Sequence, residues 1–206
     1  MKLLFATGNS FKFSLMKERL KELKEIELVS PKMLGINIEV VEDGKTAGEN
    51  SLKKARAYYD ATKLATIAED SGLYIDEFSD EEQPGLYVKR VNGREDLTDE
   101  EILEYYISKL NEHGGKSLAH YCTGVAIINE NGEIFTDIDR ERDFLLISKK
   151  CDKEGKSGGI LGYISYDLDS NKYFNERTIE DEKEHYKVLD EKYRQLVKKY
   201  ILKKNE

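Results

Sequence analysis

Two short segments carry residue types that suit phosphate chemistry, and the first is Ala68–Leu73 (AEDSGL). Here Glu69 and Asp70 place two adjacent carboxylates directly after an apolar run, followed by Ser71 and a glycine. Carboxylate oxygens are ligands that Mg²⁺ prefers, usually one or two together with waters and substrate phosphates. The segment therefore predicts a metal site with an activated water. The alternative is a solvated acidic turn, because Asp-Ser-Gly is common in turns.

The second segment is ATGNSFK, which ends at Lys12 and lies between an apolar run and an expected helix. The free amides and the dipole at a helix N-terminus attract anions. Gly8 lets the backbone approach a phosphate, Thr7 and Asn9 flank it, and Lys12 adds a positive charge. The segment predicts a phosphate site. An ordinary turn with an asparagine cap and a solvated lysine explains the same spacing equally well.

A third group of polar residues precedes the next expected helix. Glu42, Glu49 and Asn50 flank Gly44, and Lys54 follows one helical turn beyond Asn50. They could supply another metal ligand and another phosphate contact. A capped, amphipathic helix start explains Glu49 and Lys54 just as well.

Composition limits the partners of the chain. Its 206 residues include 33 Lys+Arg and 41 Asp+Glu, for a net charge of -8, so we expect no nucleic-acid or membrane partner. An anionic ligand must be drawn by a local cationic site or a bound cation. No apolar run approaches the ~20 residues that span a bilayer, and the N-terminal one is too short for a signal peptide. Cys122 and Cys151 have no metal-ligand spacing, which predicts reduced thiols and a cytoplasmic protein.

Hydrophobic spacing and turn signals predict an α/β protein with a mixed sheet flanked by helices. Asn131-Gly132 is a strong hairpin signal between two long strands, and Thr98 with Glu101 fits a capping box. A glycine-rich loop is expected over 155–162, and the strand at 64–68 should deliver the acidic pair at its C-terminal end. The expected strands are 3–6, 26–29, 36–41, 64–68, 117–128 and 133–147, and the expected helices are 13–23, 46–62, 98–113 and a long C-terminal one.

The ordered segments resemble one known family. ATGNSFK, GKTAGENSLKKA, AEDSGL, PGLYVKR, GGILGY and FNERTIEDEKE follow one another as in the house-cleaning inosine/xanthosine triphosphate pyrophosphatases. The resemblance implies that residues 1–206 form a single domain with a long mixed sheet and two lobes around a central cleft. It also implies a homodimer that hydrolyses non-standard purine nucleoside triphosphates to monophosphate and pyrophosphate, using Mg²⁺.

The resemblance assigns roles to individual residues. Asp70 is expected to be the general base that activates water, and Glu42, Glu69 and Asp70 to form the metal site. The expected substrate contacts are Thr7, Gly8, Asn9, Lys12, Lys54, Ser71, Lys89, Gly162, Tyr163 and Lys183.

The departures from the family pattern gather in the base-recognition half. The family's F-G-Y-D is Leu161–Ile164 here, and its S-H-R aligns with Lys187–Leu189, so His185 could replace the histidine only with a local shift. The family's acid before the motif glycine is Val41, which leaves Glu42 as the candidate ligand. Since losing base-reading hydrogen bonds can cost orders of magnitude, inosine specificity does not transfer.

Three functions remain open. The first is a Mg²⁺-dependent nucleoside triphosphate pyrophosphatase with altered base preference. The second is a non-catalytic nucleotide-binding protein that kept the fold. The third is an enzyme for another phosphorylated metabolite, which the phosphate-binding lysines make least attractive.

Overall fold

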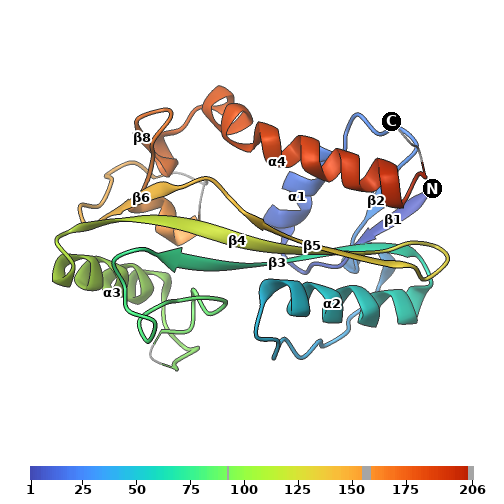
Figure 1. Ribbon diagram of the computed structural model, residues 1–206, viewed down its shortest axis with the longest axis horizontal. Helices are drawn as coiled ribbons and strands as arrows, with labels where there is room; N and C mark the ends of the chain where they lie inside the picture. The colour runs from blue at the N-terminus through green and yellow to red at the C-terminus, as the bar shows by residue number, and fades with distance from the viewer. Residues whose placement is uncertain (92, 155–158, 204–206) are drawn as a thin grey trace. The chain divides into compact units, whose positions relative to one another are not determined.

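The computed structural model describes residues 1–91, 93–154 and 159–203. Its strands form an 8-stranded sheet in the order β2-β1-β3-β4-β6-β7-β8, with β5 paired to β4 outside this path (Figure 1). β1 pairs with β2 and β3 in parallel, whereas β6 pairs with β4 and β7 antiparallel. The predicted α/β class, a mixed sheet flanked by helices, is confirmed.

The strands are β1 Lys2–Phe5, β2 Glu27–Val29, β3 Ala65–Ile75, β4 Lys116–Ile128, β5 Ile134–Arg140, β6 Phe144–Ile147, β7 Ser165–Asp167 and β8 Lys172–Tyr173. The α-helices are α1 Ser10–Arg19, α2 Ala47–Thr62, α3 Asp99–Glu112 and α4 Ile179–Tyr200. The short 3-10 helices are η1 Lys32–Leu34, η2 Gly159–Tyr163 and η3 Phe174–Glu176. In the described part of the chain, no helix combines the length and the apolar character needed to cross a membrane.

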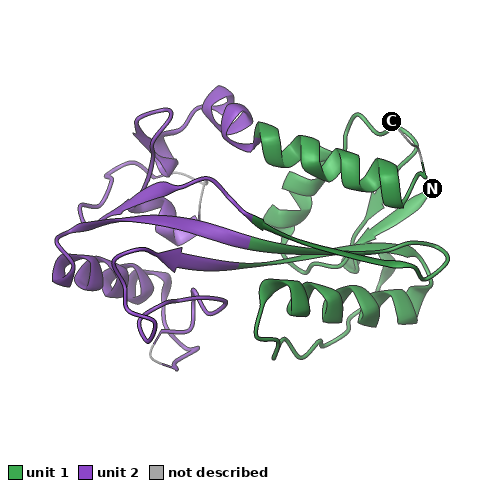
Figure 2. Ribbon diagram, viewed as in Figure 1, with its two compact units in different colours: residues 1–71, 123–139, 187–206 green, residues 72–122, 140–186 purple. Residues whose placement is uncertain are grey.

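The chain folds into two compact units (Figure 2). Unit 1 comprises residues 1–71, 123–139 and 187–206, and unit 2 comprises residues 72–122 and 140–186. Strands β3 and β4 and helix α4 each contribute residues to both units. The predicted single domain with two lobes around a cleft stays a prediction.

The core of unit 1 has two layers, because consecutive strand residues point to opposite faces of the sheet. Leu3 and Phe5 of β1 pack into a buried cluster with α1 and α4, and Leu4 packs into another with α2. On β3, Ile67 joins the first cluster and Ala68 the second. This alternation also decides to which side of the sheet each later residue of β3 points.

The core of unit 2 forms around α3. Its buried stripe includes Ile102, Tyr106 and Leu110, which cluster with residues of β3 and β6. The predicted capping box is present, since Thr98 and Glu101 bond each other's backbone amides. The helix ends just before Gly114 and Gly115, which have φ of +84° and +82°. The prediction for this helix is confirmed at both ends.

The acidic pair lies within a strand, which corrects the expectation that the strand ends there. β3 continues from Ala65 to Ile75, so Glu69 and Asp70 occupy its middle. The parallel partner β1 ends at Phe5, which pairs with Ile67, whereas β4 flanks β3 on its other side. Pairing with β4 overrides the turn preference of Asp-Ser-Gly, as tertiary context often does.

Three other boundaries differ from the sequence-based expectations. Residues 36–41 do not form a strand. Ile36, Ile38 and Val40 pack against the cluster that contains α2. The alternation of apolar residues therefore reflects burial of alternate side chains, without hydrogen bonding to a neighbouring strand. The expected strand 133–147 is split into β5 and β6 by a charged segment. The first helix ends at Arg19, before Leu23. Residues 155–158 of the expected glycine-rich loop lie outside the described residues, and Gly159–Tyr163 forms η2.

We expect Gly124→Ala to destabilise unit 1. A Cβ at Gly124 would lie 2.3 Å from the amide nitrogen of Gly48 and 2.4 Å from the carbonyl carbon of Ala47, at the start of α2. Backbone atoms cannot rotate away, so the substitution should lower the free energy of unfolding by ~1–3 kcal/mol in urea denaturation. Gly8→Ala is the matched control, because its Cβ meets nothing within 4 Å. Equal stability of both variants would contradict the close packing of β4 on α2.

Candidate active site

A cavity of about 410 Å³ lies in unit 1, and Ala6 and Thr7, which directly follow β1, are among its walls. Ligands of α/β proteins bind outside the carboxyl ends of parallel strands, and this cavity has that position. Its lining combines residues from the start of α1, the segment before α2, α2 itself and β3. They are Ala6, Thr7, Gly8, Asn9, Lys12, Asn37, Ile38, Val40, Glu42, Lys54, Tyr58 and Glu69.

The start of α1 is held by its own side chains. The amide of Asn9 donates to Thr7 Oγ1 over 3.1 Å, and Asn9 Oδ1 accepts from the amides of Phe11 and Lys12 over 2.9 and 3.2 Å. Asn9 is thus the helix cap that the simpler interpretation expected. Gly8 has a negative φ and open space where a Cβ would be, so neither its conformation nor packing demands glycine there.

Asp70 points to the α2 side of the sheet. Asn50 Nδ2 donates to Asp70 Oδ2 over 3.0 Å, and Lys54 Nζ lies 3.4 Å from Asp70 Oδ1. Asn50 is buried, and its Oδ1 accepts from the amide of Gly44 over 2.8 Å. One asparagine therefore ties the segment before α2 to the carboxylate on β3.

Lys54 joins two of the predicted ligands. Its Nζ lies 3.0 Å from Glu42 Oε2 as well as 3.4 Å from Asp70 Oδ1, and its side chain is 13% exposed. The structure thus brings Glu42, Lys54 and Asp70 together. Among residues 1–91, 93–154 and 159–203, no group of three or more His, Cys, Asp or Glu side chains could hold a metal ion by itself.

Glu69 points to the opposite side, toward α1 and α4. Tyr193 Oη donates to Glu69 Oε2 over 2.7 Å, Arg19 Nη1 lies 3.7 Å from the same oxygen, and Lys12 Nζ lies 3.6 Å from Oε1. Arg19 also bonds Asp190 over 2.9 Å. Burial lowers the pKa of Arg19, but the charges of Glu69 and Asp190 and the hydrogen bond to Asp190 raise it above its ordinary value. The role of Glu69 as a metal ligand stays a prediction. In the structure, Glu69 is held by ion pairs and by one hydrogen bond.

The remaining predicted residues are divided between the units. Ser71 ends unit 1, where its hydroxyl is 2.9 Å from that of Thr123. In unit 2, Lys89 is exposed beside Asp99, and the ring of Tyr163 lies 5.0 Å from Lys150 Nζ. Gly162 is buried in η2, and Lys183 is exposed on α4.

The positions that depart from the family pattern are unsuited to base reading. Leu161 is 2% exposed and Ile164 is fully buried, so both belong to the core of unit 2. Val188 is exposed and Leu189 is half-buried, and neither side chain can form hydrogen bonds.

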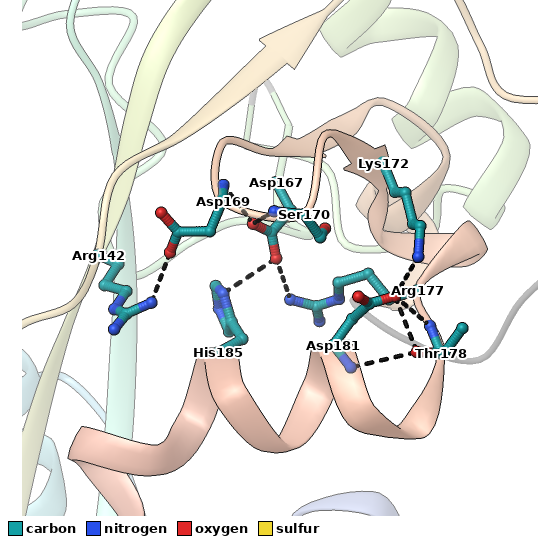
Figure 3. A network of polar contacts seen from close by, with 9 residues as sticks. All are labelled: Arg142, Asp167, Asp169, Ser170, Lys172, Arg177, Thr178, Asp181 and His185. Atoms are coloured by element: carbon teal, nitrogen blue, oxygen red, sulfur yellow. Dashed lines mark hydrogen bonds and ion pairs between the residues drawn. The ribbon is translucent and has the colours of Figure 1, made fainter.

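His185, which could replace the missing histidine only with a local shift, lies against the buried ion pair of Asp167 and Arg177 (Figure 3). Its Nδ1 lies 3.2 Å from Asp167 Oδ2, which also accepts from Arg177 Nη1 over 3.2 Å. The Asp167 and Arg177 side chains are 3% and 0% exposed. Nearby, Asp181 Oδ2 accepts from Lys172 and from the amide of Thr178, which fixes the first turn of α4.

Sequence reasoning missed the residues that hold the site together. Arg19, Tyr193 and Asp190 were not expected near it. Arg19 is the last residue of α1, and no neighbouring residue in the sequence indicates that its side chain is buried. Long-range pairing alone brings these residues to Glu69, 124 positions from Tyr193.

Lysines and carboxylates beside the end of a parallel strand are typical of α/β proteins that bind phosphorylated ligands. The family model described as the Ham1 family matches residues 3–139. Since this is more than half of the chain, the protein belongs to the Ham1 family, and the resemblance is confirmed.

Individual relatives agree with this membership. The chain is 30% identical to the dITP/XTP pyrophosphatase of Campylobacter jejuni subsp. doylei over 195 residues, covering 83% of this chain and 90% of that protein. It is 34% identical to the dITP/XTP pyrophosphatase of Leptospira interrogans over 131 residues, covering 64% of each.

Solved structures agree on the fold. The HAM1 protein from Coxiella burnetii matches with a TM-score of 0.76 at 23% identity, over 96% of this chain and 98% of that one. The Staphylococcus aureus Ham1 protein matches with a TM-score of 0.73 at 21% identity, over 95% and 99%.

We expect acid to destabilise the protein through His185. Burial and the nearby Arg177 and Arg142 lower the pKa of His185 from 6.5 to about 4, although Asp167 and Asp169 oppose this. The folded protein therefore binds this proton less readily than the unfolded chain. The stability present above pH 6.5 should fall, by on the order of 2–3 kcal/mol, as the pH drops toward 4.

The measurement is urea unfolding at several pH values across this window, for the wild type and His185→Gln. Glutamine cannot take up the proton, so its stability should depend less on pH there, whatever its absolute stability. Parallel pH profiles for the two proteins would contradict the role of His185.

Proposed function

We propose that this protein is a Mg²⁺-dependent nucleoside triphosphate pyrophosphatase that releases a nucleoside monophosphate and pyrophosphate. Membership of the Ham1 family and the names of the relatives support the reaction. The observation that carries it is Lys54, which contacts both Glu42 and Asp70 beside a cavity that Lys12 also lines. The proposed base, the proposed metal ligand and two cations thus lie close together.

The two lysines bind the polyphosphate. The protein has a net charge of -8, so an anionic ligand depends on local positive charge. Lys12 and Lys54 supply it, and the backbone at Gly8 leaves room for a phosphate at the start of α1. Thr7 and Asn9 shape that loop through the Asn9 cap.

Mg²⁺ fits this donor set only together with substrate. Glu42 and Asp70 are oxygen donors joined by one lysine, and Mg²⁺ is commonly held by one or two carboxylates plus substrate phosphates. When bound, it would neutralise charge that develops on the phosphates. Glu42 and Asp70 are the residues that would hold it, and Glu69 is left to its ion pairs.

Asp70 accepts the proton as water attacks the α-phosphorus. Asn50 and Lys54 bond different oxygens of its carboxylate and so hold its orientation. The bond between the α-phosphorus and the bridging oxygen breaks, and pyrophosphate leaves with its charge stabilised by the lysines. Catalysis of this kind depends mainly on positioning and electrostatics.

The base preference is proposed to differ from that of the named relatives. Leu161 and Ile164 are core residues, Val188 and Leu189 are apolar, and His185 is paired with Asp167. Sites that lack hydrogen-bonding groups discriminate bases weakly. Gly162, Tyr163, Lys89 and Lys183 remain the expected substrate contacts of unit 2. The homodimer also stays a prediction.

We expect purified protein with Mg²⁺ to release pyrophosphate from a panel of nucleoside triphosphates, including dITP and XTP. Asp70→Asn should reduce turnover at least ~100-fold, since general base catalysis contributes that much. Asp60→Asn is the control, because Asp60 is an exposed carboxylate on α2 whose ion pair with Lys63 lies at the protein surface. Pyrophosphate and phosphate are measured separately.

Other outcomes decide between the alternatives. Release of phosphate instead of pyrophosphate would contradict the proposed bond. Nucleotide-induced thermal stabilisation without turnover would favour the non-catalytic nucleotide-binding protein. Turnover of a different phosphorylated metabolite alone would favour the third hypothesis.

We expect Gly8→Ala to weaken substrate binding without weakening the fold. No described atom outside residues 7–9 lies within 4 Å of the added Cβ, yet Gly8 lines the cavity. A methyl group in the path of a phosphate should raise KM about tenfold, comparable to overpacking a tight contact. The measurement is KM together with urea stability. An unchanged KM would contradict close approach of the ligand at Gly8.

A further inference from the structure

We propose that Tyr193 and Arg19 are positioning residues that act through Glu69 on the phosphate-binding Lys12. The inference rests on the proposed function, because it takes Lys12 as a ligand of the triphosphate. It assigns the C-terminal helix α4 a part in substrate binding.

The two oxygens of Glu69 have separate partners. Oε2 accepts the hydroxyl of Tyr193 over 2.7 Å and lies 3.7 Å from Arg19 Nη1. Oε1 lies 3.6 Å from Lys12 Nζ, and both Glu69 and Lys12 line the cavity. One oxygen thus anchors the carboxylate in the protein, and the other faces the lysine.

The anchor is itself fixed. Tyr193 is 1% exposed and Arg19 is 7% exposed. The Arg19 guanidinium lies 4.7 Å from the ring centre of Tyr193, and its Nε donates to Asp190 over 2.9 Å. A hydrogen bond to a charged group in such a setting is stronger than one between neutral groups. The carboxylate of Glu69 is therefore held in one orientation.

This orientation matters because Lys12 is the more exposed partner. Its side chain is 31% exposed, against 8% for Glu69. A partly exposed lysine normally loses side-chain entropy when it is immobilised on a ligand. A fixed carboxylate reduces the conformations available to Lys12 beforehand, so less entropy is lost when a phosphate binds.

The two lysines of the site differ in this respect. Lys54 is paired with Glu42 and Asp70, which belong to the proposed catalytic set. Lys12 is paired with a residue that is tied to the core of unit 1 through Tyr193 and Arg19. Glu69 therefore serves as an orienting anion rather than as a ligand of the metal.

Tyr193→Phe tests the inference, because it removes one hydroxyl and keeps the ring. We expect KM for the triphosphate to rise about threefold to tenfold, with kcat changed less than about twofold. Binding of inorganic tripolyphosphate, measured by calorimetry, should weaken by the same factor, since this probe has no base. Val197→Ala is the matched control: it loosens the same buried cluster one helical turn further along α4 but leaves Glu69 untouched.

A double-mutant cycle locates the effect. In a Lys12→Gln background, Tyr193→Phe should change neither KM nor tripolyphosphate affinity further, because the group being positioned is gone. Additive effects, a KM increase in Val197→Ala equal to that in Tyr193→Phe, or an unchanged Tyr193→Phe would overturn the inference while leaving the proposed function intact. A wild type that neither binds tripolyphosphate nor hydrolyses any triphosphate would overturn both.

Discussion

The pleat of β3 is the constraint on which the site depends. Successive side chains of a strand point to opposite faces, so Glu69 and Asp70 cannot act on the same side of the sheet, although they are neighbours in the chain. Asp70 follows Ala68 toward α2 and contacts Asn50 and Lys54. Glu69 follows Ile67 toward α1 and α4 and contacts Lys12 and Tyr193. One acidic motif thus contacts two different sets of partners.

Burial of charge explains why each carboxylate needs its own set of partners. A carboxylate removed from water is costly unless ion pairs and hydrogen bonds compensate it. Glu69 is compensated by Arg19, Lys12 and the Tyr193 hydroxyl, which draws α4 onto the same face as α1. The same principle operates within unit 2, where Asp167 is compensated by Arg177 and the backbone amides of Asp169 and Ser170. Burial raises the pKa of Asp167, but these hydrogen bonds hold it below its ordinary value.

Local signals predicted local structure well. The capping box at Thr98 and Glu101 is present, and so is the hairpin turn at Asn131-Gly132, where Gly132 has a φ of +78°. These features depend on residues a few positions apart, so the sequence contains the whole interaction. The strand expected over 36–41 was wrong for the complementary reason: the alternation was real, but a strand also needs a partner, and pairing is a long-range property.

The sequence by itself determined the composition of the site: its two lysines, its three acidic residues, and the order of segments that marks the Ham1 family. Residue type and spacing are sufficient for that, because they decide which charges and donors exist. Only the tertiary structure decided which acid faces which lysine. Lys54 meets Glu42 and Asp70, and Lys12 meets Glu69, because the register of β3 and the packing of α1, α2 and α4 bring together residues up to 171 positions apart, as in the Arg19–Asp190 pair. Contacts between residues so far apart in the sequence produce no periodic pattern, so the sequence alone does not predict them.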